Sequence, residues 1–196
     1  VNSYGNDFKE ELSGYNFPKL LQDIEKIDGI EIIRFMSPHP KDFGDELIEV
    51  IKNSSKISRQ IHLPLQSGNT NVLKRMNRKY TKEEFLNLAK KLKQADENIS
   101  LSTDIIVGFP NETEEEFKDT LDVVEKVKFD QIFMFIYSKR SGTIAAKMED
   151  MVPYEEKVDR LERLKKLYES YLSFNNQNMV GKEYKVLVEG KSKNNK

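Results

Sequence analysis

The sequence predicts an α/β fold built on a parallel sheet. Short apolar runs rich in β-branched and aromatic residues alternate with longer segments whose apolar residues recur at helical spacing. Strands separated by helices of this length form βαβ units, whose crossovers make neighbouring strands parallel. The alternation ends at Pro153, where one long amphipathic segment begins. We therefore expect a parallel α/β domain followed by a C-terminal helix.

Local chemistry sets the boundaries of the predicted elements. Thr81 with Glu84, and Thr113 with Glu116, have the spacing of capping boxes, which satisfy free backbone N–H groups at a helix start. The predicted helices span residues 17–27, 45–53, 69–78, 81–95, 113–127 and 154–177. The predicted strands span residues 30–37, 59–68, 100–109 and 129–138, with residues 1–5 as the possible tail of an earlier strand and residues 182–190 as the first strand of an antiparallel module.

Pro64 breaks a local rule, because it lies inside the strand predicted over residues 59–68. Proline has no N–H group to donate to the ladder of a central strand. Two alternatives follow. Either the strand kinks at Pro64, or its carboxyl end has already left the sheet toward a ligand.

The composition limits the chemistry of the chain. It has 196 residues, 37% of them apolar and 33% charged, with a net charge of −1, which suits one well-cored domain with a small appendage. Its apolar runs are shorter than a membrane span, and no signal segment opens the chain, so we expect a cytoplasmic location without a membrane partner. The chain contains no cysteine, which excludes disulfides, thiol catalysis and thiolate metal sites within it.

The junction between the strand ending near Gly108 and the following helix is a candidate ligand site. Ligands of α/β proteins bind beyond the carboxyl ends of the strands, and a helix start can hold a phosphate. Here, however, the first helical turn is crowded with carboxylates, which suit the helix dipole but would repel a second anion. These carboxylates belong to Glu112, Glu114, Glu115 and Glu116. We expect a neutral or cationic group at this junction.

Polar side chains near the other strand ends are further candidates. The amide of Gln66 and the hydroxyl of Ser67 suit a polar ligand, although Ser-Gly-Asn is also ordinary turn chemistry. Arg78, at the end of a short helix and among other basic residues, suits either an anion or a solvated face. Asp104 lies in an apolar run, where an ionised carboxylate must be paired or bound to a ligand. The residues alone favour a strand-end pocket for a ligand without phosphate and leave the function open.

The ordered motifs "VNSYG", "GIEIIRFMSPHP", "IHLPLQSGN", "VLKRMNRKYT", "STDIIVGFPNET" and "FIYSKRSGTIAAKM" resemble those of the radical-SAM methylthiotransferases. The likeness runs from Val1 to about Gly190. It is greatest to the branch that adds a methylthio group to a prenylated adenosine of tRNA. The resemblance implies a partial (β/α)6 barrel over residues 1–153, without its first strand and most of its second. It also implies a closing helix over residues 154–180 and, over residues 181–196, the truncated and partly disordered start of a TRAM domain.

The resemblance implies that S-adenosylmethionine binds at the strand ends. The adenine-contacting motif of the family corresponds to Ile106 and Gly108, and the position near the ribose to Gln66 and Ser67. Arg78 corresponds to the basic residue that faces the methionine carboxylate, and Asp104 to a polar position on the strand. The acidic residue that often follows the glycine is replaced by Asn111, with Glu112 one place later.

The family also holds [4Fe–4S] clusters on cysteines, and this chain has none. We therefore expect an excised C-terminal piece, without catalytic residues or metal ligands, that is inactive alone while its parent enzyme modifies tRNA. The alternatives are a related methylthiotransferase acting on threonylcarbamoyl-adenosine or a ribosomal protein, and a non-catalytic scaffold that binds RNA or a partner. Residues 30–37 and 182–190 would be open strand edges, through which we expect self-association.

Overall fold

A computed structural model describes residues 2–5, 14–36, 38–177, 179–183, 188 and 190 of the chain. The predicted strand over residues 182–190 lies largely outside these residues, as do residues 191–196. In chain order the elements are α1 (Phe17–Glu25), η1 (Pro40–Asp42), α2 (Asp45–Asn53), β1 (Gln60–His62), α3 (Thr70–Arg75), α4 (Lys82–Ala95), β2 (Ser100–Val107), α5 (Glu114–Val127), β3 (Gln131–Ile136), η2 (Ala145–Lys147) and α6 (Tyr154–Gln177).

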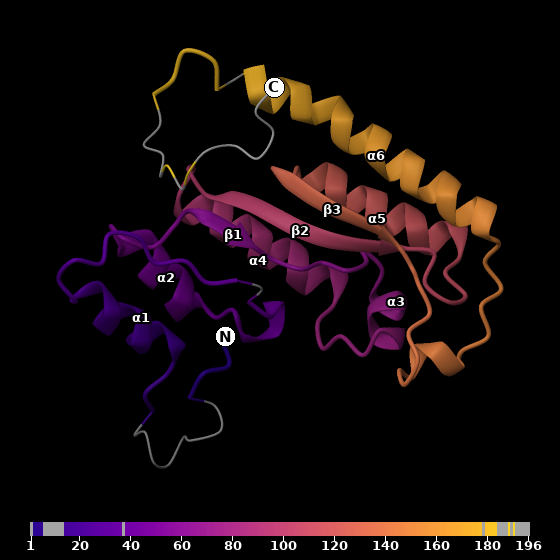
Figure 1. Cartoon of the computed structure of the whole chain (residues 1–196), viewed down its shortest axis with the longest axis horizontal. Helices are drawn as coiled ribbons and strands as arrows, with labels where there is room; N and C mark the ends of the chain where they lie inside the picture. The colour runs from indigo at the N-terminus through magenta and orange to yellow at the C-terminus, as the bar shows by residue number, and fades with distance from the viewer. Residues whose placement is uncertain are drawn as a thin grey trace.

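The centre of the fold is a parallel sheet in the order β1-β2-β3, which confirms the predicted α/β class. Its register pairs His62 with Ser102 and Asp104 with Phe133. Helices α4 and α5 cover one face of the sheet, and α6 packs beside α5 and against β3 (Figure 1). Sequential strands with their helices on one side are the arrangement of a βα-barrel segment rather than of a doubly wound sheet.

The core fills the space between the covered face of the sheet and these helices. Every second residue of β2, from Leu101 to Val107, is fully buried there. The two capping boxes, at Thr81 and Thr113, are present as predicted and fix the starts of α4 and α5. The main partners from the helices and loops are Phe85, Leu92, Phe117, Val124, Phe129 and Leu164. Among the described residues, no helix is long and apolar enough to cross a membrane.

The predicted strand over residues 30–37 is wrong as a regular strand. Among its described residues, it forms a single parallel bridge between Ile33 and Ile57. The N–H of Ile33 donates to the carbonyl of Lys56 at 2.8 Å, and its carbonyl accepts from the N–H of Ser58 at 2.9 Å. The segment therefore pairs with the loop before β1 rather than with β1, and one bridge does not make a ladder. Residues 2–5 form a turn and add no further strand.

The predicted strand over residues 59–68 is also interrupted, at Pro64. Strand β1 ends at His62, and the N–H of Leu65 donates to the side chain of Thr103 at 2.9 Å instead of to a carbonyl. Gln66 then returns to the sheet in a bridge with Ile105, with a left-handed backbone at φ 67°. Of the two alternatives, the kink is confirmed.

The helices follow their predicted ranges more closely, and α6 matches its range in full. Helix α1 ends at Glu25 rather than residue 27, and Ile27 is 52% exposed instead of packed. Helix α3 ends at Arg75 rather than residue 78, because Asn77 takes a left-handed backbone with φ 57°.

Candidate functional site

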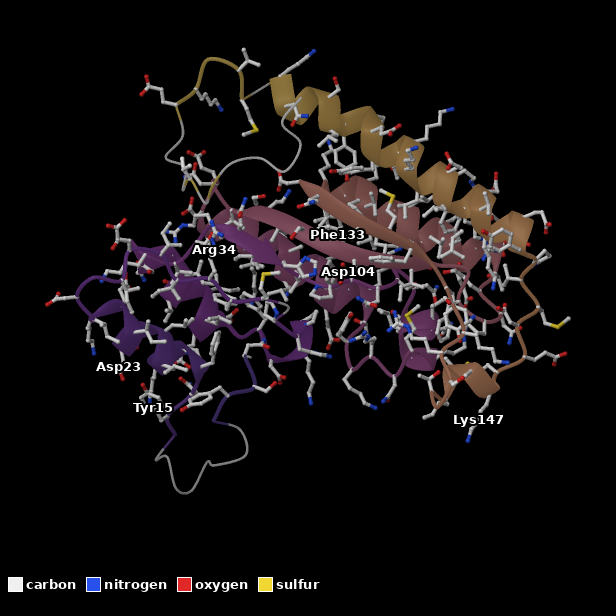
Figure 2. The ribbon with its side chains drawn as sticks, viewed as in Figure 1. Tyr15, Asp23, Arg34, Asp104, Phe133 and Lys147 are labelled. Atoms are coloured by element: carbon white, nitrogen blue, oxygen red, sulfur yellow. The ribbon has the colours of Figure 1, made fainter. Side chains whose placement is uncertain are left out.

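The uncovered face of the sheet is the candidate site. Alternate residues of β2 and β3 point to it, and they are more polar and more exposed than those on the covered face. Phe133 is 42% exposed and Phe135 is 51% exposed, although large aromatic side chains in a sheet are usually covered. Figure 2 shows Asp104 and Phe133 together on this face, away from α4 and α5. Both phenylalanines therefore lie on the sheet face rather than in the core.

His62 and Ser102 join Asp104 in one hydrogen-bonded group on this face. The imidazole Nδ1 of His62 lies 3.0 Å from the hydroxyl of Ser102, and its Nε2 lies 3.3 Å from Oδ2 of Asp104. The imidazole also packs edge-on against Phe133, with ring centroids 5.9 Å apart. Asp104 is thus paired within the chain and still partly open, with its side chain 31% exposed. The polar alternation Ser100, Ser102, Asp104 was a signal for this face that sequence reasoning missed.

Gln66, Ser67 and Gly68 form the turn that follows the kink, close against α5. The Ser67 side chain is fully buried, and its hydroxyl lies 3.4 Å from that of Thr120. The N–H of Gly68 donates to the same Thr120 hydroxyl at 2.9 Å. The structure thus directs the Ser67 hydroxyl at α5 rather than at the open face. Gln66 is 8% exposed. Its backbone N–H donates to the carbonyl of Asp104, and its carbonyl accepts from the N–H of Ile106, both in β2.

Arg78 lies in the loop between α3 and α4, and one donor of its guanidinium group is unsatisfied. Its Nε is buried without a hydrogen-bond partner, and no described residue forms an ion pair with it. Burial, followed by the charge of Arg78, holds the pKa of His39 below its usual value. Tyr80 fixes the loop by donating to the carbonyls of Pro64 and Leu65, both at 3.0 Å. A half-buried cation with an orphaned donor is suited to an anionic ligand group such as a carboxylate.

The strand-helix junction at Gly108 is filled by the chain itself. Gly108 has φ +68°, and a Cβ atom there would lie 2.3 Å from Cγ of Lys157 in α6. Its N–H donates to the carboxylate of Glu112 at 2.8 Å, and Arg160 donates to the same carboxylate at 3.0 Å. Burial raises the pKa of Glu112, while these two donors act in the opposite direction. Ile106, on the strand just before Gly108, lies partly exposed on the open face.

The carboxylates at the start of α5 and just before it therefore bind cations of this chain. Besides Glu112 with Arg160, Glu114 accepts from Arg163 at 2.6 Å. Glu116 accepts from Arg75 at 2.7 Å. Three arginines from α3 and α6 thus neutralise three of the four carboxylates, while Glu115 is exposed and has no ion-pair partner among the described residues. Sequence reasoning missed this because the partners are 41 to 49 residues away.

The family model of the radical SAM superfamily matches residues 9–124. The chain belongs to the radical SAM superfamily. It is 53% identical over 195 residues to the tRNA-2-methylthio-N(6)-dimethylallyladenosine synthase of Caldicellulosiruptor saccharolyticus, covering 100% of this chain and 41% of that protein. It is 51% identical to the synthase of that name from Acetivibrio thermocellus, covering 100% and 40%. This radical SAM chain thus spans about two fifths of the length of the curated relatives it matches.

Among solved structures, the radical SAM enzyme coproporphyrinogen III oxidase from Escherichia coli is similar, with a TM-score of 0.46 and 18% identity over 74% of this chain and 39% of that chain.

Proposed function

We propose that this radical SAM chain is part of a tRNA methylthiotransferase that modifies N6-dimethylallyladenosine. The observation that carries the proposal is the 53% identity to a synthase of that name along the whole chain. The open face of the sheet, with its polar row and exposed aromatic rings, supports a role for this part in binding S-adenosylmethionine.

Three features of the described residues support binding of S-adenosylmethionine. The orphaned Nε of Arg78 calls for an anion, and the carboxylate of the methionine part supplies one. Asp104 offers acceptors to the ribose or ammonium groups, and Ile106 with Phe135 offers apolar surface to the adenine. Gly108 directly follows the end of the same strand, β2. Gln66 and Ser67 would contribute through the turn they form rather than through the Ser67 hydroxyl.

The residues of this chain do not fit a [4Fe–4S] cluster, since the chain contains no cysteine. Among the described residues, no group of three histidines or carboxylates is placed to hold a metal ion either. When both cofactors are bound to a radical SAM enzyme, they supply the radical chemistry themselves. The contribution of this chain is to bind, orient and shield the nucleoside groups.

A tRNA partner is supported by cations at the carboxyl ends of the strands. Lys41, Lys79 and three residues of the loop after β3 have no ion-pair partner among the described residues; those three are Lys139, Arg140 and Lys147. The carboxylates Glu112, Glu114, Glu116 and Asp150 nearby are instead paired within the chain. These cations without ion-pair partners, three of them in one loop, favour a polyanion at this edge.

The proposal is tested in a bacterial strain whose own synthase gene is deleted, complemented with the complete reading frame that contains this chain. We expect mass spectrometry of the tRNA nucleosides to show the 2-methylthio group restored, and Arg78→Ala to reduce it strongly. The control is Lys165→Ala, an exposed substitution on α6. Unmodified tRNA with the unsubstituted protein, expressed at the same level, would contradict the proposal.

A further inference from the structure

In the group formed by Ser102, His62 and Asp104, the carboxylate decides which imidazole nitrogen donates to it. An ionised carboxylate only accepts, so Nε2 of His62 carries the proton that is directed at Oδ2 of Asp104, 3.3 Å away. In the neutral imidazole the other nitrogen is then an acceptor, and the Ser102 hydroxyl donates to Nδ1 at 3.0 Å. Each bond polarises the next in the same direction, toward the carboxylate.

The imidazole of His62 is itself held rigidly. The residue is 9% exposed, its backbone belongs to β1, and its ring packs edge-on against Phe133. The carboxylate of Asp104 is different, since its side chain is 31% exposed on the open face. In the described part of the chain, its Oδ1 has no hydrogen-bond donor, while Oδ2 has His62. A buried donor thus holds one oxygen of a partly exposed carboxylate and leaves the other without a donor.

The surface next to this free oxygen is aromatic. Phe133 is the register partner of Asp104, and Phe135 follows on the same face, at 42% and 51% exposure. A flat apolar surface beside one oriented acceptor matches a nucleoside, whose base lies on the rings while an amino or hydroxyl group donates to the carboxylate.

We propose that His62 is a positioning residue, which orients the Asp104 carboxylate so that its free oxygen accepts a hydrogen bond from a nucleoside lying on Phe133 and Phe135. The nucleoside class rests on the proposed function, whereas the orienting role does not. His62 acts through Asp104 and needs no contact with the ligand.

The orienting role is tested by NMR on the isotope-labelled chain, with three variants of His62. The three-bond couplings from Asp104 Cγ to its backbone N and C′ report whether the side chain keeps one χ1 rotamer. His62→Gln keeps a donor where Nε2 was, His62→Asn keeps only the Nδ1 position, and His62→Phe removes both nitrogens but keeps the ring against Phe133. We expect one rotamer in the unsubstituted chain and in the glutamine variant, and averaged couplings in the other two. Averaged couplings in the unsubstituted chain would overturn the proposal whatever the function of the protein.

The ligand is tested in the same samples by titrating S-adenosylmethionine and, separately, N6-dimethylallyladenosine to millimolar concentration. We expect the shifts of Asp104 to give an affinity about tenfold weaker in the phenylalanine and asparagine variants, the size of one hydrogen bond to a charged group, with the glutamine variant within about threefold. If the His62 variants change the affinity for S-adenosylmethionine alone, the face binds the cofactor. If they change the affinity for N6-dimethylallyladenosine alone, the face binds the RNA base. Equal affinities in all variants, or no response to either compound, would overturn the assignment. Thermal unfolding of each variant separates a loss of fold from a loss of orientation.

Discussion

Arg160 donates to the carboxylate of Glu112 at 3.0 Å and to its backbone carbonyl at 2.9 Å, and both side chains are 1% exposed. Two charges removed from water in this way are stabilising only as a pair. The C-terminal helix α6 is thus attached to the strand-helix junction by a buried ion pair as well as by apolar packing.

Replacing Arg160 with methionine should lower the free energy of unfolding by about 3–5 kcal/mol, because Glu112 is left buried without its counter-ion. Arg163→Met, in a pair whose side chains are each 36% exposed, should cost less than about 1 kcal/mol. Urea denaturation measures both. The double variant Glu112→Leu with Arg160→Met should recover much of the loss, and equal costs for Arg160 and Arg163 would contradict this account.

Acid should weaken the attachment of α3 to α5 through Glu116. The hydrogen bond from Arg75 holds the pKa of Glu116 below its ordinary value of 4.5. A carboxyl whose pKa is lower in the folded state stabilises the fold above the unfolded-state pKa and loses that contribution as the pH falls through the folded-state pKa. We therefore expect Glu116→Gln to flatten the decline in stability below pH 4.5, measured by denaturation at several pH values. Glu115→Gln, on the exposed side of the same turn, is the control and should leave the decline unchanged.

Gly108→Ala should destabilise the chain by more than about 2 kcal/mol, since the added Cβ meets both a left-handed backbone and the Lys157 stem at 2.3 Å. Gly142→Ala is the matched control, with φ +84° and open space around the Cβ, and should cost about 1 kcal/mol. Calorimetry compares the two. The double variant Gly108→Ala with Lys157→Ala should separate the two causes of the lost stability, the clash with the Lys157 stem and the strain of a left-handed backbone. If Gly108→Ala lowered the free energy of unfolding no more than Gly142→Ala, the prediction would be wrong, because the Lys157 side chain would then move aside without cost.

Neutralising the loop after β3 should weaken RNA binding. In the triple variant Lys139→Ala, Arg140→Ala and Lys147→Ala, the slope of log affinity against log salt should fall by about two, as expected for three lost contacts to single-stranded phosphates. Fluorescence anisotropy with an anticodon stem-loop RNA measures it. Alanine at Lys90, Lys165 and Lys166 removes the same charge from exposed helix positions and should leave the slope nearly unchanged. Equal slopes for the two triple variants would exclude this edge of the sheet as the RNA-binding site.

The segment over residues 30–36 should mediate self-association. Ile32 is 44% exposed and Met36 is 66% exposed, and the bridge at Ile33 is the only ladder contact of this segment among the described residues. Light scattering after size exclusion should give a molar mass that rises over a tenfold concentration range, and Ile32→Lys with Met36→Lys should suppress the rise. Ile144→Lys, at a loop position that is 75% exposed, is the control. A constant mass near one chain would contradict the prediction.

The parallel α/β architecture could be predicted because the spacing of apolar residues and the capping of helices are local properties of the sequence. The boxes at Thr81 and Thr113 and the whole range of α6 follow from residues within a few positions of one another. The site was harder, because its contacts are long-range. No residue near Glu112 in the sequence predicts its contact with Arg160. Likewise, no residue near Asp104 predicts its contact with His62, which lies 42 residues earlier. The prediction of a strand over residues 30–37 was wrong for a related reason. The composition of this segment is that of a strand, but a ladder also requires a partner segment, which local sequence does not reveal.

The turn at Gly68 shows how the open face keeps its shape. A Cβ atom there would lie 2.5 Å from Cα of Thr120 and 2.6 Å from the carbonyl oxygen of Asp119, so main chain rests on main chain with no side chain between. The separation of the turn from α5 is set by van der Waals contact between backbone atoms rather than by the size of a side chain. The side chains facing a ligand can therefore be exchanged for others while the platform beneath them stays in place, and the selectivity of the face can change without its architecture.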